Sequence, residues 1–214
     1  MRSVRGERLR RAVAALAVAL VLLAAAGCGL TGNQTGGGSS IMSSPLTSAP
    51  GVATSVDYEY YGVKGSTNYE LASSMEKNGP NGYWAYTVWR VDWKYPFSQG
   101  SGGYTTGPVE VKVAVTITLP KWDPPADASP ELVKKWDSLV SALRTHEEGH
   151  RDIGVAAGQR IVKALEALPP SPSREALEQS ADQVASGMIE DGQSQDASYD
   201  ASTGHGESQG ATFF

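Results

Sequence analysis

The sequence predicts an α+β fold in which a short antiparallel sheet packs against a long helix and a second, C-terminal helix. Three observations carry this prediction. Apolar residues alternate without interruption from Val109 to Leu119, which is typical of a strand. Apolar residues recur at three- and four-residue steps from Leu132 to Ile153, which is typical of a helix with one buried face. A second amphipathic pattern runs from about Arg174 to Glu190.

The first 28 residues have the layout of a bacterial lipoprotein signal. Five Arg residues precede the apolar stretch "AVAALAVALVLLAAAG", which is too short for a comfortable membrane span. Small residues then lead to Cys28, the only cysteine of the chain. We therefore expect residues 1–28 to direct export and Cys28 to carry a lipid. The protein would then be extracytoplasmic and anchored to the cell membrane.

The next segment, residues 29–56, has no charged side chain and is rich in Gly, Ser and Thr, which predicts a flexible tether. A single globular domain is expected over residues 57–214, and with no second cysteine it must be stabilised by its core. Removal of residues 1–27 would change the formal charge from −5 to −9. Such an acidic chain argues against nucleic acid as a partner.

The first half of the domain is expected to form the sheet. "VDYEYYGV" (56–63) alternates as a strand, and "GSTNYELASSMEKNGP" (65–80) predicts a short helix that ends at Gly79-Pro80. "GYWAYTVWRVDWKYPF" (82–97) predicts a strand whose alternation changes phase, which indicates a bulge near Val88-Trp89. A Gly-rich loop at 98–107 would join it to the strand at 108–120 as an antiparallel pair.

The second half is expected to be helical. A helix would begin at Ser129-Pro130 and continue to Leu168, and its three glycines, Gly149, Gly154 and Gly158, permit a bend or a break. After the second helix, residues 191–214 are polar and Gly-rich, which predicts a loop. The chain ends in Phe213-Phe214, and we expect this end to pack back on the domain.

The long helix contains the pattern H-E-x-x-H at His146, Glu147 and His150. Residues four apart lie on the same face of a helix, so the two imidazoles can bind one Zn²⁺ ion. Glu147 lies beside that face, where it can act as a general base. Two of the three histidines of the chain belong to this motif, and both continue the apolar stripe. The pattern therefore predicts a zincin-like site between the helix and the sheet.

A third protein ligand is expected at such a site. The metzincin pattern is excluded, because Ile153 and Ala156 stand where it requires Gly and His. His205, between two glycines in "SYDASTGHGESQGA", is the favoured candidate. A gluzincin-like site would use a glutamate and an aspzincin-like site would use Asp200. The glutamates that remain candidates are Glu175, Glu178 and Glu190.

Other polar residues near the motif are candidates for supporting roles. Tyr199, close to His205 in sequence, could donate a hydrogen bond to an oxyanion, although a packed aromatic explains it equally well. Glu148, Asp152 and Asp200 could orient the histidine ligands, but a solvated helix face is the simpler explanation for Glu148 and Asp152.

The segments "LPKWDPP", "SPELVKKWDSLVSALRTHEEGHRDI" and "YDASTGHGESQGA" resemble those of the bacterial family known as domain of unknown function 922, whose members are regarded as secreted zinc-dependent proteases. The resemblance covers roughly residues 56–214. It implies that His146, Glu147 and His150 form the zinc-protease motif, and its "TGHG" segment supports His205 as a ligand.

These observations lead to two hypotheses of function. The first is an envelope-anchored zinc metalloprotease, an endopeptidase that uses a zinc-activated water with Glu147 as general base and cleaves a peptide or protein of the cell envelope. The second is a non-catalytic lipoprotein, an interaction module with a structural or vestigial metal site. A peptidoglycan metallopeptidase of the H-x-H type is not supported, because the chain has no H-x-H pair.

Overall fold

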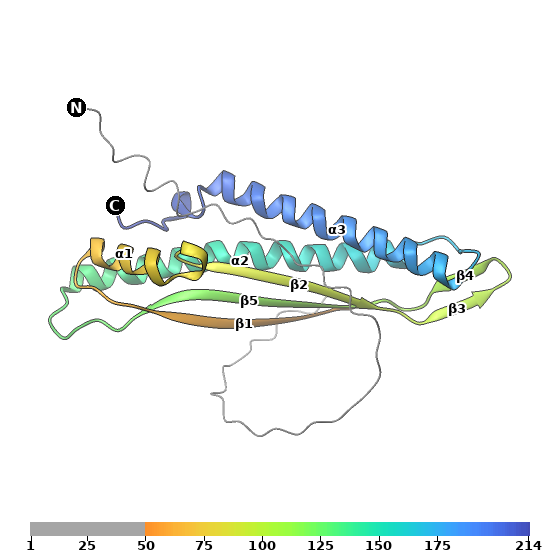
Figure 1. The fold of residues 1–214 in the computed structure, drawn as a ribbon, viewed down its shortest axis with the longest axis horizontal. Coiled ribbons are helices and arrows are strands. Elements are labelled where there is room, and N and C mark those ends of the chain that lie inside the picture. Colours follow the sequence, from red (N-terminus) through yellow and green to blue (C-terminus); the bar gives the residue numbers. More distant parts are fainter. Residues whose placement is uncertain (1–49) are drawn as a thin grey trace, which may run out of the picture.

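The computed structural model of the chain describes residues 50–214, and the fold is α+β, as predicted (Figure 1). A small sheet lies against one side of the long helix α2, and helix α3 packs along α2 in the opposite direction (Figure 1). The predicted signal, Cys28 and residues 29–49 of the predicted tether lie outside the described residues. No helix within 50–214 is long and apolar enough to cross a membrane.

The main sheet has three strands in the order β1-β5-β2. The central strand β5 (Glu110–Trp122) pairs antiparallel with β2 (Tyr86–Lys94), as predicted. It pairs in parallel with β1 (Val52–Val63), so the sheet is mixed rather than antiparallel. The uninterrupted alternation of β5 fits this central place, because its apolar face, from Val111 to Leu119, is buried along its length.

The predicted bulge in β2 is wrong. Its pairing with β5 runs without interruption, with Trp89 opposite Val115 and Val91 opposite Val113. The alternation therefore has a single phase, in which Trp89 and Val91 face the core and Val88 is 46% exposed on the other side. Trp84 had suggested the second phase, but it precedes the strand, so its orientation is not set by the strand's alternation.

Two boundaries in the first half also differ from the prediction. Strand β1 begins at Val52, which is buried, so the domain starts before Asp57. The Gly-rich segment predicted as a loop forms a hairpin of β3 (Phe97–Gly100) and β4 (Gly103–Thr106). In both places the extent of the strand is decided by its pairing with a partner strand rather than by local composition.

The short helix α1 (Asn68–Asn78) is as predicted, with Thr67 as its N-cap and Gly79 at its end. The Thr67 hydroxyl accepts a hydrogen bond from the backbone N–H of Glu70. A single turn, η2 (Pro80–Gly82), follows and leads into β2. This connection places residues 83–85 beside the second half of the chain.

Helix α2 (Pro130–Glu166) runs for 37 residues without a break, about 55 Å at 1.5 Å per residue. Ser129 caps it, as predicted. Its glycines provide close packing instead of a bend. A Cβ atom on Gly154 would lie 2.6 Å from the Trp89 ring, and one on Gly158 would lie 2.6 Å from the side chain of Val113. The glycines therefore allow the sheet to approach the helix.

Helix α3 (Arg174–Thr203) is much longer than predicted, and residues 191–203 are helical rather than loop. The extension lacks an apolar stripe, so the spacing of its residues does not predict a helix. Contact with α2 and β2 stabilises it instead, through close packing of Gly192 on Trp89 and the hydrogen bonds of Asp196 with Trp89 and His150. Propensity is readily overridden by such tertiary contacts.

After α3 the chain turns through Gly204 and a short η3 helix (Glu207–Gln209) and then packs back on the domain. Phe213 is 6% exposed, with its ring 6.0 Å from that of Trp84 and 6.3 Å from that of Trp136. The expected docking of the C-terminus is confirmed for Phe213, whereas Phe214 is 74% exposed.

Candidate metal centre

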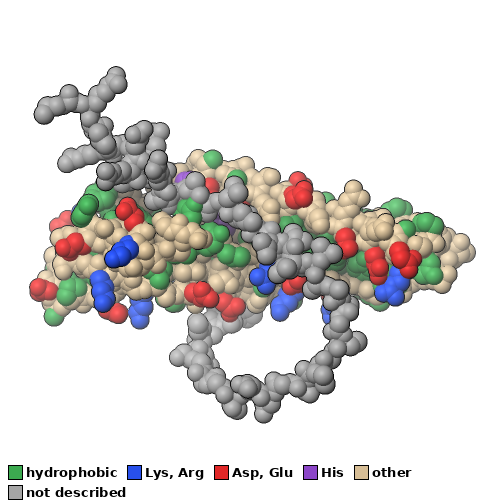
Figure 2. Space-filling view, in the orientation of Figure 1, with side chains coloured by type: hydrophobic (Ala, Val, Ile, Leu, Met, Phe, Trp, Pro, Cys, Tyr) green, Lys and Arg blue, Asp and Glu red, His purple; other side chains and the backbone are tan. Residues whose placement is uncertain are grey.

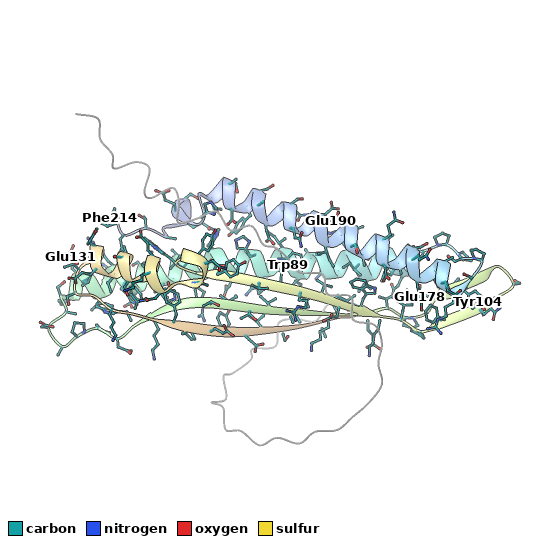
Figure 3. The ribbon with its side chains drawn as sticks, in the orientation of Figure 1. Trp89, Tyr104, Glu131, Glu178, Glu190 and Phe214 are labelled. Carbon is teal, nitrogen blue, oxygen red and sulfur yellow. The ribbon has the colours of Figure 1, made fainter. Side chains whose placement is uncertain are left out.

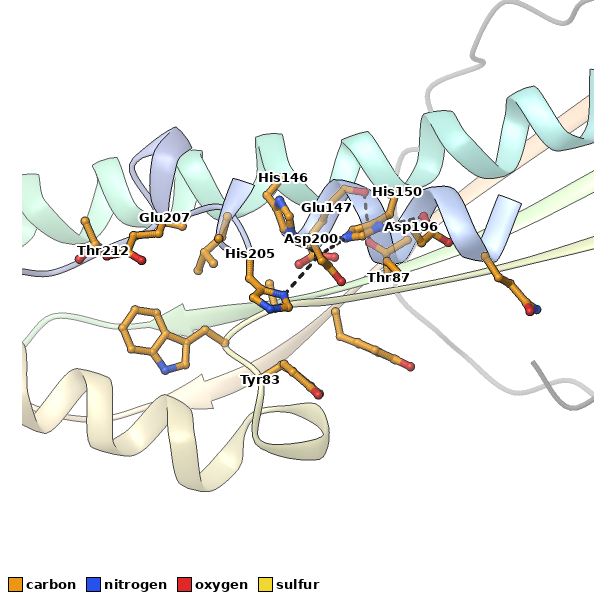
Figure 4. Close-up of a pocket in the computed structure, with 18 of the residues that line it drawn as sticks. Tyr83, Thr87, His146, Glu147, His150, Asp196, Asp200, His205, Glu207 and Thr212 are labelled. Carbon is orange, nitrogen blue, oxygen red and sulfur yellow. Dashed lines mark hydrogen bonds and ion pairs between the residues drawn. The ribbon is translucent and has the colours of Figure 1, made fainter. Parts of the chain in front are cut away.

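The two motif histidines lie on α2 where it faces the last turns of α3 (Figure 4). His146 is buried, and the side chain of His150 is 12% exposed. Their Nε2 atoms face each other at 3.3 Å. Two imidazole nitrogens four residues apart on one helix face thus converge on a single point, as the spacing predicts.

Asp200 of α3 completes this group. Its Oδ1 atom lies 3.1 Å from Nε2 of His146 and 3.1 Å from Nε2 of His150. These three ligand atoms are the donors of a candidate metal site. Ligands around a tetrahedral ion with bonds of about 2.0–2.1 Å lie about 3.3 Å apart, so the observed separations fit one small divalent cation. We refer to the three residues as the metal triad.

The orientation of His150 is fixed by a hydrogen-bond chain behind it. Its Nδ1 lies 2.8 Å from Oδ1 of Asp196, and the other oxygen of Asp196 accepts a hydrogen bond of 2.7 Å from Nε1 of Trp89. Because a carboxylate only accepts, Nδ1 carries the proton and Nε2 is left for a metal. Carboxylate partners of this kind are the usual support of metal-binding histidines.

The orientation of His146 is fixed by the C-terminal segment. Its Nδ1 lies 3.0 Å from the side-chain oxygen Oε1 of Gln209. The amide nitrogen of Gln209 in turn donates a hydrogen bond of 3.0 Å to the hydroxyl of Tyr199. The Tyr199 ring stacks on His146, with centroids 4.9 Å apart and planes at 11°. The docked C-terminus therefore positions a ligand of the triad.

His205 lies next to the triad without being part of it. Its Nδ1 is 3.4 Å from Oδ1 of Asp200, and its side chain is 28% exposed. The residue has a φ of +56° between two glycines that are also left-handed, and its backbone N–H donates to the carbonyl of Asp200. This tight turn brings His205 close to the site, and Figure 4 shows a dashed line between its ring and Asp200.

Glu147 is 4% exposed and lies in the wall of the cavity beside the triad, not among its ligand atoms. Burial raises the pKa of its carboxyl group. A hydrogen bond with Thr87 and the electrostatic effect of the two histidines both lower this pKa, but by less than burial raises it. A buried carboxyl with a raised pKa, next to a metal site, is suited to accept and return protons.

His150 and Asp200 shift the pKa of each other. Burial lowers the pKa of His150, but its hydrogen bonds with Asp196 and Asp200 outweigh burial and raise it to about 10. Burial raises the pKa of Asp200, and its hydrogen bonds with His146 and His150 hold it far below the usual value. For His205 burial is the largest effect, and the pKa is lowered despite the nearby carboxylate. Without a cation, a proton on His150 occupies the position that faces Asp200.

A cavity of about 540 Å³ opens beside the triad. Its walls come from α2, α3, the C-terminal segment and the residues that lead into β2 (Figure 4). Tyr83 and Tyr86, whose rings stack at 5.9 Å, line it opposite the triad, whereas Tyr199 is not among its lining residues. The tyrosines among the lining residues are therefore Tyr83 and Tyr86.

Most of these residues are candidates from the sequence, but some of their hydrogen-bond partners were not identified. Asp200 was one of the open alternatives for the third ligand, and the structure places it in the triad beside the favoured His205. Glu148 bonds to the hydroxyl of Tyr58, and Asp152 to Arg151, so neither contacts a histidine of the motif. Asp196 was missed. The signal was present, since Asp196 and Asp200 repeat on α3 the four-residue spacing of the histidines.

The comparisons with known proteins identify a family. A family model described as "Bacterial protein of unknown function (DUF922)" matches residues 58–206, which include His146, Glu147, His150, Asp200 and His205. No curated protein and no solved structure matches the chain. The match ends before Gln209, so the support that the C-terminal segment gives to His146 lies outside it.

Proposed function

The chain belongs to the DUF922 family, and from the geometry of its metal triad we propose that it is a zinc-dependent metalloprotease, an endopeptidase with Glu147 as general base. His146, His150 and Asp200 would hold the ion. A bound Zn²⁺ ion would polarise a peptide carbonyl and lower the pKa of a water molecule beside it. The observation that carries the proposal is the buried carboxyl group of Glu147 in the wall of the cavity, next to the triad.

The side chain of Glu147 supplies the proton transfers. Because its pKa is raised by burial, it accepts a proton more readily than an exposed glutamate, and it can return that proton to the leaving amine. Thr87 holds the turn that carries Glu147, since its hydroxyl donates a hydrogen bond of 3.2 Å to the backbone carbonyl of Glu147. The phenol groups of Tyr83 and Tyr86 can donate hydrogen bonds to a substrate carbonyl from the opposite wall.

The border of the cavity favours a peptide as substrate. Five consecutive residues, 83–87, line it, from the bends at Trp84 and Ala85 to the first two residues of β2. The cavity therefore borders the start of this strand. Strand β2 is an edge strand of its sheet, and an edge can bind an extended peptide through backbone hydrogen bonds.

The proposed location follows from the first 28 residues. We propose that the protein is exported and anchored to the cell membrane by a lipid on Cys28, so that its substrate is a peptide or protein of the cell envelope. The chain would then act on substrates within reach of the tether.

A second function is favoured by one observation, the closeness of His205 to Asp200. If Nδ1 of His205 became a fourth protein ligand, the site would be closed, as structural zinc sites are. The protein would then be a non-catalytic interaction module.

The test compares Glu147→Gln with Glu148→Gln in the zinc-loaded protein, with fluorescein-labelled casein as substrate. Glu148 is the matched control, because it is the neighbouring glutamate and does not line the cavity. We expect Glu147→Gln to abolish cleavage while the zinc content remains at that of the wild type, and Glu148→Gln to retain both. Cleavage by Glu147→Gln at the wild-type rate would contradict its role as base. A zinc-loaded wild type that cleaves nothing would favour the non-catalytic module.

A further inference from the structure

The wall of the cavity is rich in acidic side chains. Six of the residues that line it are acidic, and within residues 50–214 no Lys or Arg side chain lines it. Three of the six belong to the site already described, namely Glu147, Asp196 and Asp200. The other three are Glu76, Glu190 and Glu207. All three are exposed, and none takes part in an ion pair found among the described residues.

These three glutamates come from different parts of the chain and lie at different points of the cavity rim. Glu76 belongs to α1, Glu190 to α3 and Glu207 to the C-terminal turn. Glu207 lies on one side of His205 and Asp196 on the other in Figure 4, and Glu190 lies farther along α3 (Figure 3). The negative charge therefore extends to both sides of the metal triad.

The helix that forms one wall has the same bias. From Glu175 to Phe214 the chain contains eight acidic residues and no Lys or Arg. In Figure 2 the charged side chains visible over the middle of α3 are Asp or Glu, whereas over the sheet Lys and Arg side chains are mixed with Asp and Glu. The exposed charges at the rim of the cavity are therefore negative, and charges of one sign at a cleft concentrate ligands of the opposite sign.

We propose that the substrate of this site is a cationic peptide segment, with Lys or Arg side chains on one or both sides of the bond that is cleaved. The inference rests on the peptidase function proposed above and adds the chemistry of the substrate. Backbone hydrogen bonds with the segment that leads into β2 hold the peptide extended, and its basic side chains reach the rim glutamates.

The geometry sets how far the basic residue lies from the cleaved bond. Glu190 is ten residues before Asp200 on one helix, about 15 Å along its axis. An extended peptide covers about 3.3 Å per residue, so about four residues span this distance. A long Lys or Arg side chain covers part of this distance and so reduces the number of residues that are needed. Basic residues are therefore selected within about four positions of the cleavage site.

The test uses the zinc-loaded protein and a pair of fluorescein-labelled decapeptides, one with lysines and one with glutamines in their place. Cleavage is measured as kcat/KM, and binding is measured by fluorescence polarisation with the Glu147→Gln variant. Glu190→Gln and Glu207→Gln remove rim charges, and Asp137→Asn is the control, an exposed acidic residue of α2 that does not line the cavity.

We expect the lysine peptide to be preferred, and each rim substitution to lower kcat/KM for it by about twofold to fivefold, in the range of exposed charge pairs. The rim substitutions should not change kcat/KM for the glutamine peptide. The Asp137→Asn substitution should not change kcat/KM for the lysine peptide. Added salt should reduce the preference, because ions screen exposed charges.

Three other results would each be decisive. Equal cleavage of both peptides, unaffected by the rim substitutions, would overturn the cationic preference and leave the peptidase function standing. If the lysine peptide binds but is not cleaved, and the rim substitutions weaken that binding, the peptidase function is overturned. The site would then bind cationic peptides without cleaving them. Neither cleavage nor binding of the two peptides would overturn both.

Discussion

His150 and Asp196 form a hydrogen bond of 2.8 Å between Nδ1 and Oδ1 across the interface of α2 and α3. This contact turns Nε2 of His150 towards His146 and Asp200. The metal triad is thus a property of two helices that pack together, each contributing a pair of polar residues at four-residue spacing.

The third ligand is tested by comparing Asp200→Ala with His205→Ala. We expect Asp200→Ala to weaken zinc binding by at least about 100-fold, more than the loss of a residue that only supports a ligand. His205→Ala should weaken it less, because His205 contacts the triad only through Asp200 in the structure. The measurement is zinc content by mass spectrometry together with a chelator competition. A greater loss in His205→Ala would show that His205 is a ligand and would favour a closed site.

The support of His150 by Asp196 is tested with Asp196→Asn. We expect a decrease of about 10- to 100-fold in zinc affinity, as for other partners of metal-binding histidines. The far-UV circular dichroism should not change. Asp191→Asn is the matched control, because Asp191 is exposed on the same helix and does not contact the site. Equal zinc affinity of Asp196→Asn and wild type would show that Asp196 does not support His150 as a ligand.

The packing of α3 on α2 is tested with Gly149→Ala. A Cβ atom there would lie 2.4 Å from the ring of Tyr199, which stacks on His146. We expect the free energy of unfolding in urea to decrease by about 1–3 kcal/mol, as for other overpacked sites. Gly187→Ala is the control, because no atom lies within 4 Å of a Cβ at this helical position. It should increase stability by about 0.5–1 kcal/mol. A neutral Gly149→Ala would show that the helices are not in close contact there.

The competition between metal and protons is tested by the pH dependence of zinc affinity. In the metal-free protein the pKa of His150 is raised to about 10, so below that pH a proton must leave when the ion binds. Apparent affinity should therefore rise about tenfold per pH unit between pH 7 and 9. A histidine with the ordinary pKa of about 6.5 would give a plateau over this range. The Asp196→Asn variant, which removes one of the hydrogen bonds that raise this pKa, should reach the plateau at lower pH.

Several elements could be predicted because their signals are local. The alternation of β5 marks a strand buried on one face, and Ser129-Pro130 marks the start of α2. The spacing of His146 and His150 predicted that both rings would converge, and they do. The phase of β2 was misjudged because Trp84, which lies outside the strand, was counted with Tyr86 and Val88. The parallel pairing of β1 with β5 could not be read from either strand alone, because it depends on where α1 and β2 return the chain.

The α+β core, the long amphipathic helix with a histidine pair on its buried face, and the glutamate beside that pair can all be predicted from the amino-acid sequence. These features follow from periodicity, and periodicity is a property of neighbours in the chain. The helical conformation of residues 191–203, the place of Asp200 beside the two histidines and the contacts of Asp196 and Gln209 with those histidines depend on how the chain packs. They could not be predicted because this part of α3 has no apolar stripe. Its conformation is stabilised by the helix and the strand against which it packs, and those contacts span 46 or more residues of sequence.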